Sequence, residues 1–216
     1  MLELYIITGS NGAGKSSLGS YFLPLNIREN NIVFDGDKLF MDKQREIWKS
    51  GITAIKEAKK IAIAFVNDTF NSIVEEAILS KNNFAYEGHF TNDATWDIPK
   101  RFKNEGYTIH LIFLGLTNTE ISQTRVGERV KVGGHYVDPK TVNANFYGNL
   151  EKLDKYFSIF DTLKIMDTSV SEFLEVCNLE NGEVVSSVEN YLLPKWFVEN
   201  LPYISQIISV KSNSKT

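Results

Sequence analysis

Short apolar runs alternate with longer amphipathic segments along this chain, which is the pattern of a parallel α/β fold. The apolar run at 108–116 is continuous, as in a strand that is buried on both faces of a sheet. Right-handed strand–helix–strand units then predict a central parallel sheet with helices on both faces. The predicted strands cover residues 2–8, 31–34, 83–86, 108–116 and 162–169. The predicted helices cover about 15–22, 53–80, 118–131 and 139–159.

The segment 53–80 is predicted to form one long helix. Most apolar residues from Ile55 to Ile73 recur three or four positions apart, which is the spacing of one helix face. Glu76 follows Ala62 by fourteen residues, close to four helical turns. We therefore expect Glu76 on the apolar face, where a carboxylate needs a partner or a ligand. The alternative is a rim position, paired with a lysine.

Composition narrows the class of protein. The 216 residues are 43% hydrophobic and 23% charged, which is typical of a globular protein. The net charge of −4 argues against nucleic acid or an anionic membrane surface as a partner. No run approaches the roughly 20 apolar residues of a membrane span, and the N-terminus lacks a basic leader. Cys177 is the single cysteine, so no internal disulfide forms, which fits a cytoplasmic protein.

The segment "GSNGAGKS" follows the first predicted strand and precedes a helix. It matches G-x-x-x-x-G-K-[ST], a loop whose backbone N–H groups cradle phosphates. Lys15 is expected to reach the β- and γ-phosphates of ATP, and the Ser16 hydroxyl to coordinate Mg²⁺. The alternative is a glycine turn that only joins strand to helix. The predicted nucleotide-binding residues are Gly9, Ser10, Asn11, Gly12, Ala13, Gly14, Lys15, Ser16 and Ser17.

Other motifs separate the classes of P-loop protein. A transporter-type ATPase needs an LSGGQ signature and an Asp-Glu after an apolar run, and a GTPase needs an Asn-Lys-x-Asp motif. The sequence contains neither. A small-molecule kinase needs a carboxylate at the acceptor hydroxyl and cations at the transferred phosphate. These groups gather outside the carboxyl ends of the strands in an open α/β sheet.

Carboxylates follow the second and third predicted strands. Asp35 and Asp37 lie in "FDGD", and Glu87 lies in "YEGHF". One of the two aspartates can orient or deprotonate an acceptor hydroxyl, and the other can bind a metal-bound water. Glu87 is a candidate substrate-binding residue beside the loop. The alternatives are an ordinary Asp-Gly turn and a glutamate that begins a surface turn.

The segment "TRVGERVKVGGHYVDP" is the candidate lid. Arg125 and Arg129 lie four residues apart, so both guanidinium groups face the same side of a helix. There they can neutralise the charge that develops on a transferred phosphoryl group. Gly133 and Gly134 would supply a hinge. The alternative is a solvated helix face on which Glu128 pairs with the arginines.

The chain is expected to divide into a P-loop kinase domain at 1–170, a C-terminal appendage at 171–208 that packs on the same domain, and a disordered tail at 209–216. A turn is expected at 180–183. Three aromatic residues of the appendage are expected in the core, namely Tyr191, Trp196 and Phe197.

The motifs "GSNGAGKSS", "FDGD", "YEGHF", "GYTIHLIFLGL", "RVGERVKVGGHYVD" and "MDTS" occur in this order, and over residues 1–170 the chain resembles the zeta-toxin-like P-loop kinases. The resemblance implies a strand order of 2-3-1-4-5 and an antitoxin as a partner. It also implies phosphorylation of a small hydroxylated acceptor such as a UDP-amino sugar. It places the catalytic aspartate on Asp37, substrate-binding glutamates on Glu76 and Glu87, and the first lid arginine on Arg125 or Arg129.

One stretch departs from the family pattern. Relatives carry an Ile-x-Arg-Arg-Tyr helix after the GGH segment, whereas residues 142–150 read "VNANFYGNL". Lys131 or Lys140 would replace an arginine only in part, because lysine lacks the bidentate fork. The sequence therefore predicts an ATP- and Mg²⁺-dependent kinase. A nucleotide-binding protein that has lost transfer stays open as an alternative. A polynucleotide 5′-hydroxyl kinase is disfavoured by the acidic net charge.

Overall fold

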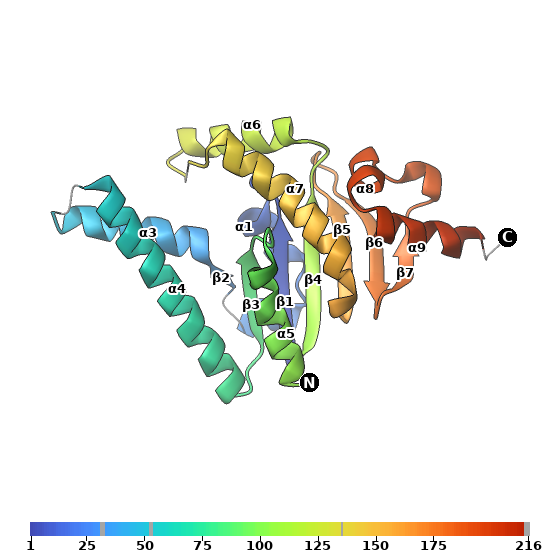
Figure 1. Cartoon of the computed structure of the whole chain (residues 1–216), viewed down its shortest axis with the longest axis horizontal. Coiled ribbons are helices and arrows are strands. Elements are labelled where there is room, and N and C mark those ends of the chain that lie inside the picture. The colour runs from blue at the N-terminus through green and yellow to red at the C-terminus, as the bar shows by residue number, and fades with distance from the viewer. Residues whose placement is uncertain (31–32, 52–53, 135, 214–216) are drawn as a thin grey trace.

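The computed structural model describes residues 1–30, 33–51, 54–134 and 136–213, which form a seven-stranded sheet with helices on both faces (Figure 1). The strand order is β2-β3-β1-β4-β5-β6-β7, and the first five strands are parallel. This confirms the predicted α/β class and the order 2-3-1-4-5. The parallel strands are β1 (Glu3–Gly9), β2 (Phe34–Asp35), β3 (Phe84–Gly88), β4 (Thr108–Gly115) and β5 (Thr162–Asp167).

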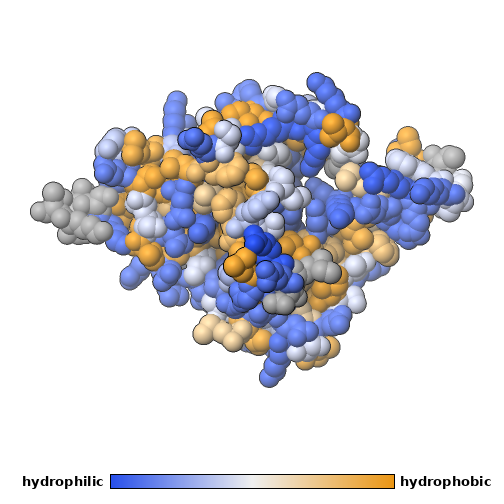
Figure 2. Space-filling view, turned by 180° about the vertical axis from the view of Figure 1, so that it is seen from behind, coloured by the Kyte–Doolittle hydropathy of each residue, from blue (hydrophilic) through white to orange (hydrophobic). Residues whose placement is uncertain are grey.

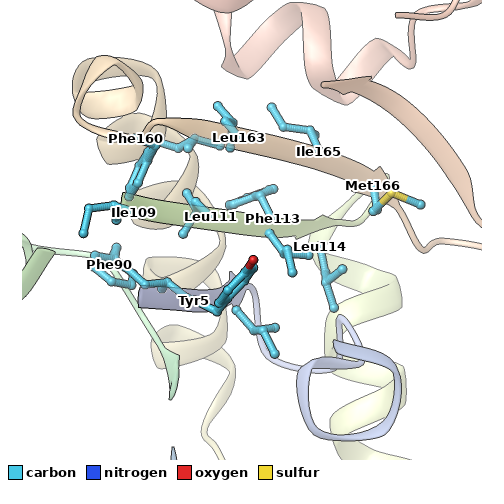
Figure 3. Close-up of a cluster of buried hydrophobic side chains, with 14 of the residues drawn as sticks. Tyr5, Phe90, Ile109, Leu111, Phe113, Leu114, Phe160, Leu163, Ile165 and Met166 are labelled. Carbon is cyan, nitrogen blue, oxygen red and sulfur yellow. The ribbon is translucent and has the colours of Figure 1, made fainter. Parts of the chain in front are cut away.

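The core lies on the central strands, as their continuous apolar runs predict. From the second residue onward, every residue of β1 is buried. On the neighbouring strands, Leu111 of β4 pairs with Leu163 of β5, and Phe113 pairs with Ile165. Figure 3 shows these side chains together in one buried cluster. The sheet is therefore a rigid platform whose carboxyl edge carries the phosphate-binding loop.

Some of the helices begin at side-chain caps. The Asn118 side chain accepts a hydrogen bond from the Ile121 N–H, and the Asp138 side chain accepts one from the Thr141 N–H. After the loop, the predicted helix is a single α-turn followed by a 3₁₀ turn at 19–22. The helices are α1 (Lys15–Leu18), α2 (Leu25–Asn30), α3 (Gly36–Lys49), α4 (Ile55–Leu79), α5 (Asp97–Asn104), α6 (Thr119–Lys131), α7 (Pro139–Tyr156), α8 (Lys195–Asn200) and α9 (Pro202–Asn213). No helix in the described ranges is both long and apolar enough to cross a membrane.

Two expected elements reach past the described residues. The strand expected at 31–34 is observed at Phe34–Asp35, and residues 31–32 of that prediction lie outside the described part of the chain. The helix expected at 53–80 is observed at Ile55–Leu79, and residue 53 likewise lies outside.

Helices α3 and α4 pair into an arm that projects from the β2 edge of the sheet (Figure 1). Seen from behind, the arm extends to the right, and its outer surface is mostly hydrophilic (Figure 2). It has its own small core, in which Ile47, Ala58 and Ala62 are buried and Phe40 packs against them. Helix α3 is an element that the sequence did not predict.

Glu76 does not lie on an inward face. It is exposed near the end of α4, so the expectation of a buried carboxylate is wrong. The two halves of α4 pack against different partners. Ala62 belongs to the core of the arm, whereas Val74 and Ala77 belong to the core of the sheet. The buried stripe therefore rotates along the helix, and the extrapolation from Ala62 to Glu76 fails.

The C-terminal segment extends the sheet. Strands β6 (Leu174–Glu180) and β7 (Glu183–Ser187) are antiparallel, and Asn181 and Gly182 join them with φ angles of 49° and 80°. These positive angles are typical of a two-residue hairpin turn. Trp196 and Phe197 are buried, but Tyr191 is 79% exposed, so the expectation that it belongs to the core is wrong. Helix α9 continues into the predicted tail as far as residue 213, and residues 214–216 lie outside the described part.

Candidate phosphotransfer site

The glycine loop lies between β1 and α1, as expected for this motif, which follows a strand and precedes a helix. Gly9 has a φ of +142°, and a Cβ there would lie 2.2 Å from the Leu114 carbonyl oxygen. Gly14 precedes α1 in a left-handed conformation with a φ of 94°. No other residue fits either position without strain. The Lys15 ammonium folds back over the loop and donates to the carbonyls of Gly9 at 3.1 Å and Ser10 at 3.0 Å.

Helices α6 and α7 both hold the loop at Asn11. Ser122 of α6 donates its hydroxyl hydrogen to the Asn11 carbonyl at 2.5 Å. Asn145 of α7 donates its amide hydrogen to the Asn11 side-chain oxygen at 2.8 Å. Ser122 and Asn11 are both buried, and Asn145 is partly buried. The conformation of the loop is therefore held by side chains of α6 and α7 as well as by its own glycines.

Two further side chains hold the next turn of the loop. Arg125 donates to the Gly12 carbonyl at 3.3 Å and to the Ser169 carbonyl at 2.8 Å. Thr168, which follows β5, donates its hydroxyl hydrogen to the Ala13 carbonyl at 2.9 Å. Arg125 thus ties α6, the loop and the end of β5 together, a positioning role that its sequence pattern did not predict.

Two cavities meet at this loop. The loop cavity, of about 610 Å³, lies among the glycine loop, Arg125 and Arg129 of α6, and residues 168–173 after β5. The arm cavity, of about 510 Å³, lies between the arm, the ends of β2 and β3, and α5. Lys15 and Asp37 line both cavities. These two residues therefore occupy the boundary between the two spaces.

The carboxylates at the strand ends come together as expected. Asp35 and Glu87 are neighbours in the β2–β3 register. Asp35 also caps α3, because its Oδ1 accepts from the Lys38 N–H at 3.0 Å. Asp37 follows in the first turn of α3. Both aspartates and Glu87 line the arm cavity, whereas of the three only Asp37 also reaches the loop cavity.

Burial perturbs the charged groups of the site. It lowers the pKa of Lys15 to about 8, although Asp37 and Glu87 act in the opposite direction. Burial raises the pKa of Glu87 to about 7, against the effect of a hydrogen bond from Ser16. The Ser16 hydroxyl donates that bond to Glu87 Oε2 at 2.8 Å. A cluster of perturbed groups of this kind is typical of a functional site.

The donor atoms around Ser16 suit a hard divalent cation. Mg²⁺ takes oxygen ligands and is usually bound by one or two carboxylates together with waters and substrate phosphates. The Ser16 hydroxyl and the Glu87 carboxylate are oxygen donors within 2.8 Å of each other beside the loop. The described residues contain no cluster of three His, Cys, Asp or Glu that could hold a metal without a phosphate ligand.

Arg125 and Arg129 both line the loop cavity, as their spacing predicts. The glycine pair after them caps α6, since the Gly134 N–H donates to the Arg129 carbonyl at 2.9 Å and Gly133 has a φ of +87°. A Cβ on Gly134 would lie 2.4 Å from Arg129 Cγ. The pair therefore gives Arg129 room to pack, and a role as a hinge remains a prediction.

The arginine-free stretch of α7 contributes Asn149, which sequence reasoning did not select. Its Oδ1 accepts from the Phe90 N–H at 2.6 Å, so its amide nitrogen faces His89 Nδ1, 3.3 Å away. His89 Nε2 lies 3.5 Å from Lys15 Nζ. Burial, reinforced by Lys15 and Arg129, lowers the pKa of His89 well below its ordinary value. An asparagine gives no sequence signal for this role, because the role depends on partners from distant segments.

Comparison with known proteins identifies the family. The zeta toxin family model matches residues 3–175. The chain belongs to the zeta toxin family. An uncharacterized protein of Haemophilus influenzae is 29% identical over 129 residues, which is 60% of this chain and 81% of that protein.

Solved structures share the zeta toxin fold of this chain at low sequence identity. A chain of the AvrRxo1-ORF1:ORF2 complex with ATP superposes with a TM-score of 0.69 at 14% identity, over 93% of this chain and 64% of that chain. The present chain thus spans just under two thirds of that protein. A chain of the PezAT toxin–antitoxin system of Streptococcus pneumoniae superposes with a TM-score of 0.57 at 17% identity, over 98% of this chain and 85% of that chain.

The residues that the zeta toxin resemblance implies are not all brought together. Asp37, Glu87, Arg125 and Arg129 lie around Lys15 along the two cavities. Glu76 lines neither cavity and is exposed further along α4. The residues of α4 that face the arm cavity lie about two to five turns earlier, from Lys59 to Phe70.

Proposed function

We propose that this chain is an ATP- and Mg²⁺-dependent phosphotransferase that transfers a γ-phosphoryl group to a hydroxyl of a small acceptor. The observation that carries the proposal is the position of Lys15 and Asp37 at the boundary of two cavities. One cavity contains the phosphate-binding loop, and the other contains none of its residues except Lys15. This arrangement supports a phosphate donor in the loop cavity and an acceptor in the arm cavity, with transfer beside Lys15 and Asp37.

The loop cavity would hold the triphosphate. The loop N–H groups and Lys15 would bind the phosphate oxygens, and Ser16 would hold Mg²⁺ with Glu87 beside it. When bound, Mg²⁺ supplies positive charge to the β- and γ-phosphate oxygens. Lys15 must leave the carbonyls of Gly9 and Ser10 to reach the phosphates, and the perturbed pKa of about 8 rises again when anionic oxygens surround it.

The transfer step needs a base and a charge clamp. Asp37 would accept the proton of the acceptor hydroxyl while that oxygen forms a bond to the γ-phosphorus. The bond from this phosphorus to the β,γ-bridging oxygen breaks, and its electron pair leaves on ADP. Arg125 and Arg129 would neutralise charge on the transferred group. Catalysis is then mostly positioning and electrostatic stabilisation.

The test is ADP release by the purified protein, with and without a pool of hydroxylated metabolites that includes UDP-amino sugars. Asp37→Asn should lower acceptor-stimulated release by about 10²- to 10⁴-fold while ATP binding by calorimetry is retained. The matched control is Asp42→Asn, because Asp42 is exposed on the same helix and lines neither cavity. Stimulated release that survives in Asp37→Asn would overturn the assigned role.

The arginine-free stretch at 142–150 favours a second candidate, a protein that binds ATP without transferring phosphate. This candidate predicts calorimetric ATP binding and no phosphorylated product from any acceptor pool. A mass-spectrometric screen for products that gain a phosphoryl group separates the two candidates.

We also propose an antitoxin as a protein partner. The proposal rests on family membership and on the PezAT chain, which comes from a toxin–antitoxin system. The test is whether the product of a neighbouring gene co-purifies with this chain and suppresses its ADP release.

A further inference from the structure

An indole from the C-terminal segment lies over the end of a central strand. Trp196 of α8 is 2% exposed and stacks on Phe113 of β4, with the ring centroids 6.4 Å apart. Gly115, the last residue of β4, leaves room for it, because a Cβ there would lie 2.1 Å from the indole ring. The place that Trp196 occupies is therefore built into the strand that precedes α6.

The indole N–H points to a carboxylate on the neighbouring strand. Trp196 Nε1 donates to Asp167 Oδ2 at 2.8 Å, and Asp167 is the residue of β5 that pairs with Gly115. The other carboxylate oxygen, Oδ1, accepts from the Ser169 N–H at 2.8 Å and from the Ser169 hydroxyl at 2.5 Å. The Asp167 side chain thus holds the turn that follows β5, and Trp196 holds the Asp167 side chain.

This turn provides a hydrogen-bond acceptor for Arg125. The Ser169 carbonyl accepts from Arg125 Nη2 at 2.8 Å, and the Gly12 carbonyl accepts from Nη1 at 3.3 Å. A guanidinium has five N–H donors in one plane, more than these two bonds use. Arg125 lines the loop cavity, whereas Trp196 lines neither cavity. Any effect of Trp196 on a ligand in the loop cavity is therefore indirect.

We propose that Trp196 and Asp167 are positioning residues for phosphoryl transfer. They hold the Ser169 carbonyl in the place where it orients the Arg125 guanidinium toward the triphosphate. This inference deepens the proposed function and rests on it. It gives the C-terminal segment, which follows the family-matched residues 3–175, a part in the donor site.

Nucleotide binding tests the inference without turnover. Calorimetry on the full chain would measure the affinity for AMP-PNP, a non-hydrolysable ATP analogue, in the presence of Mg²⁺. Arg125→Ala should weaken binding by about 10-fold or more, because a charged donor to the phosphates is lost. Trp196→Phe keeps an aromatic ring over Gly115 but removes the N–H, and it should weaken binding by about 3- to 10-fold.

Trp96→Phe is the matched control for loss of a buried indole. Trp96 is 1% exposed, and its N–H has no hydrogen-bond partner in the described part of the chain. We expect the AMP-PNP affinity of Trp96→Phe to stay within twofold of that of the unmodified protein. An equal loss of affinity in Trp96→Phe and Trp196→Phe would overturn the inference.

A double-mutant cycle tests whether Trp196 acts through Arg125. Adding Trp196→Phe to Arg125→Ala should then change the affinity less than twofold, whereas independent effects would multiply and overturn the inference. Thermal unfolding checks that each variant is folded. Asp167→Asn is the second variant if Trp196→Phe does not fold, because asparagine offers an oxygen to Ser169 or to Trp196 but not to both. It should show the same dependence on Arg125.

ADP release with the pool of hydroxylated metabolites separates the inference from the proposed function. Losses of kcat that are coupled in the same cycle, with the KM for the acceptor within twofold, support both. Coupled losses of AMP-PNP affinity, with no stimulated release and no phosphorylated product, support the positioning role and count against transfer. Stimulated release on which the two substitutions act independently supports transfer and overturns the positioning role.

Discussion

The loop cavity and the arm cavity share Lys15 and Asp37, but their walls are built differently. The loop is held through its backbone carbonyls by side chains from α6 and from the end of β5, and through the Asn11 side chain by α7. The outer part of the arm packs on itself around a small separate core, whereas the later half of α4 packs against the core of the sheet through Val74 and Ala77. In the proposed function, the donor side therefore depends on a backbone that several side chains hold in place, and the acceptor side depends on how the arm packs.

The largest loss of activity should come from substitution of Lys15, which lines both cavities. Lys15→Ala should lower acceptor-dependent turnover by about 10³-fold, because one preorganised positive charge is lost from the transferred phosphate. The measurement is ADP release. Lys60→Ala, at an exposed site on α4, is the control for loss of a lysine. Turnover within tenfold of that of the unmodified protein would show that Lys15 is not needed for transfer between the two cavities.

A substitution that creates a cavity in the small core of the arm should affect the arm cavity without affecting the loop cavity. Ile47 is 5% exposed, and Ile47→Ala should destabilise the arm by about 2–4 kcal/mol. We expect faster hydrogen exchange in α3 and α4 and a higher KM for the acceptor, with nucleotide affinity within twofold. Ile61→Ala, which truncates a partly exposed side chain, should cost less than about 1 kcal/mol. If exchange rises equally in β1 and β4, the arm is not an independent unit.

The same contrast explains what could be predicted from the sequence. The loop and the carboxylates that follow β2 and β3 could be predicted from local patterns, whereas the strand order was implied by the resemblance to the family. Asp35, Asp37 and Glu87 had to meet, because the carboxyl ends of neighbouring strands share one edge.

Residues whose roles depend on distant packing could not be predicted. Glu76 was misplaced because α4 changes partners along its length, which a uniform helical period cannot reveal. Asn145 and Asn149 lie in a stretch that differs from the family in lacking arginine. Their hydrogen bonds reach segments more than fifty residues away. An asparagine side chain carries no charge or spacing signal that would mark such a contact.

The pH dependence of stability tests the junction of the two cavities. His89 has a pKa lowered by burial, so the unfolded chain binds a proton near pH 6.5 that the folded chain does not. Stability from this group is complete above about pH 6.5 and is lost as the pH falls below it. Relative to His89→Asn, the unmodified protein should lose on the order of 1 kcal/mol between pH 7 and pH 5.

Urea unfolding of both proteins across this pH range gives the difference directly. The pKa of His110 is also lowered by burial, but His110 is present in both proteins and cancels. Parallel stability curves for the two proteins would mean that His89 is not held neutral beside Lys15.

The smallest effect concerns α6, the wall of the loop cavity. Gly127 lies within this helix, and an added Cβ would meet no atom within 4 Å. Gly127→Ala should therefore stabilise the protein by about 0.5–1 kcal/mol in thermal unfolding. Gly9→Ala is the opposite control, because its Cβ would collide with the Leu114 carbonyl.

If α6 is a fixed wall, as its hydrogen bonds to Asn11 and Gly12 indicate, kcat for Gly127→Ala stays within twofold. A lower kcat together with higher stability would mean that α6 must bend during turnover. The wall of the loop cavity would then not be fixed, and the contrast between the two cavities would fail at the side that is held by more hydrogen bonds.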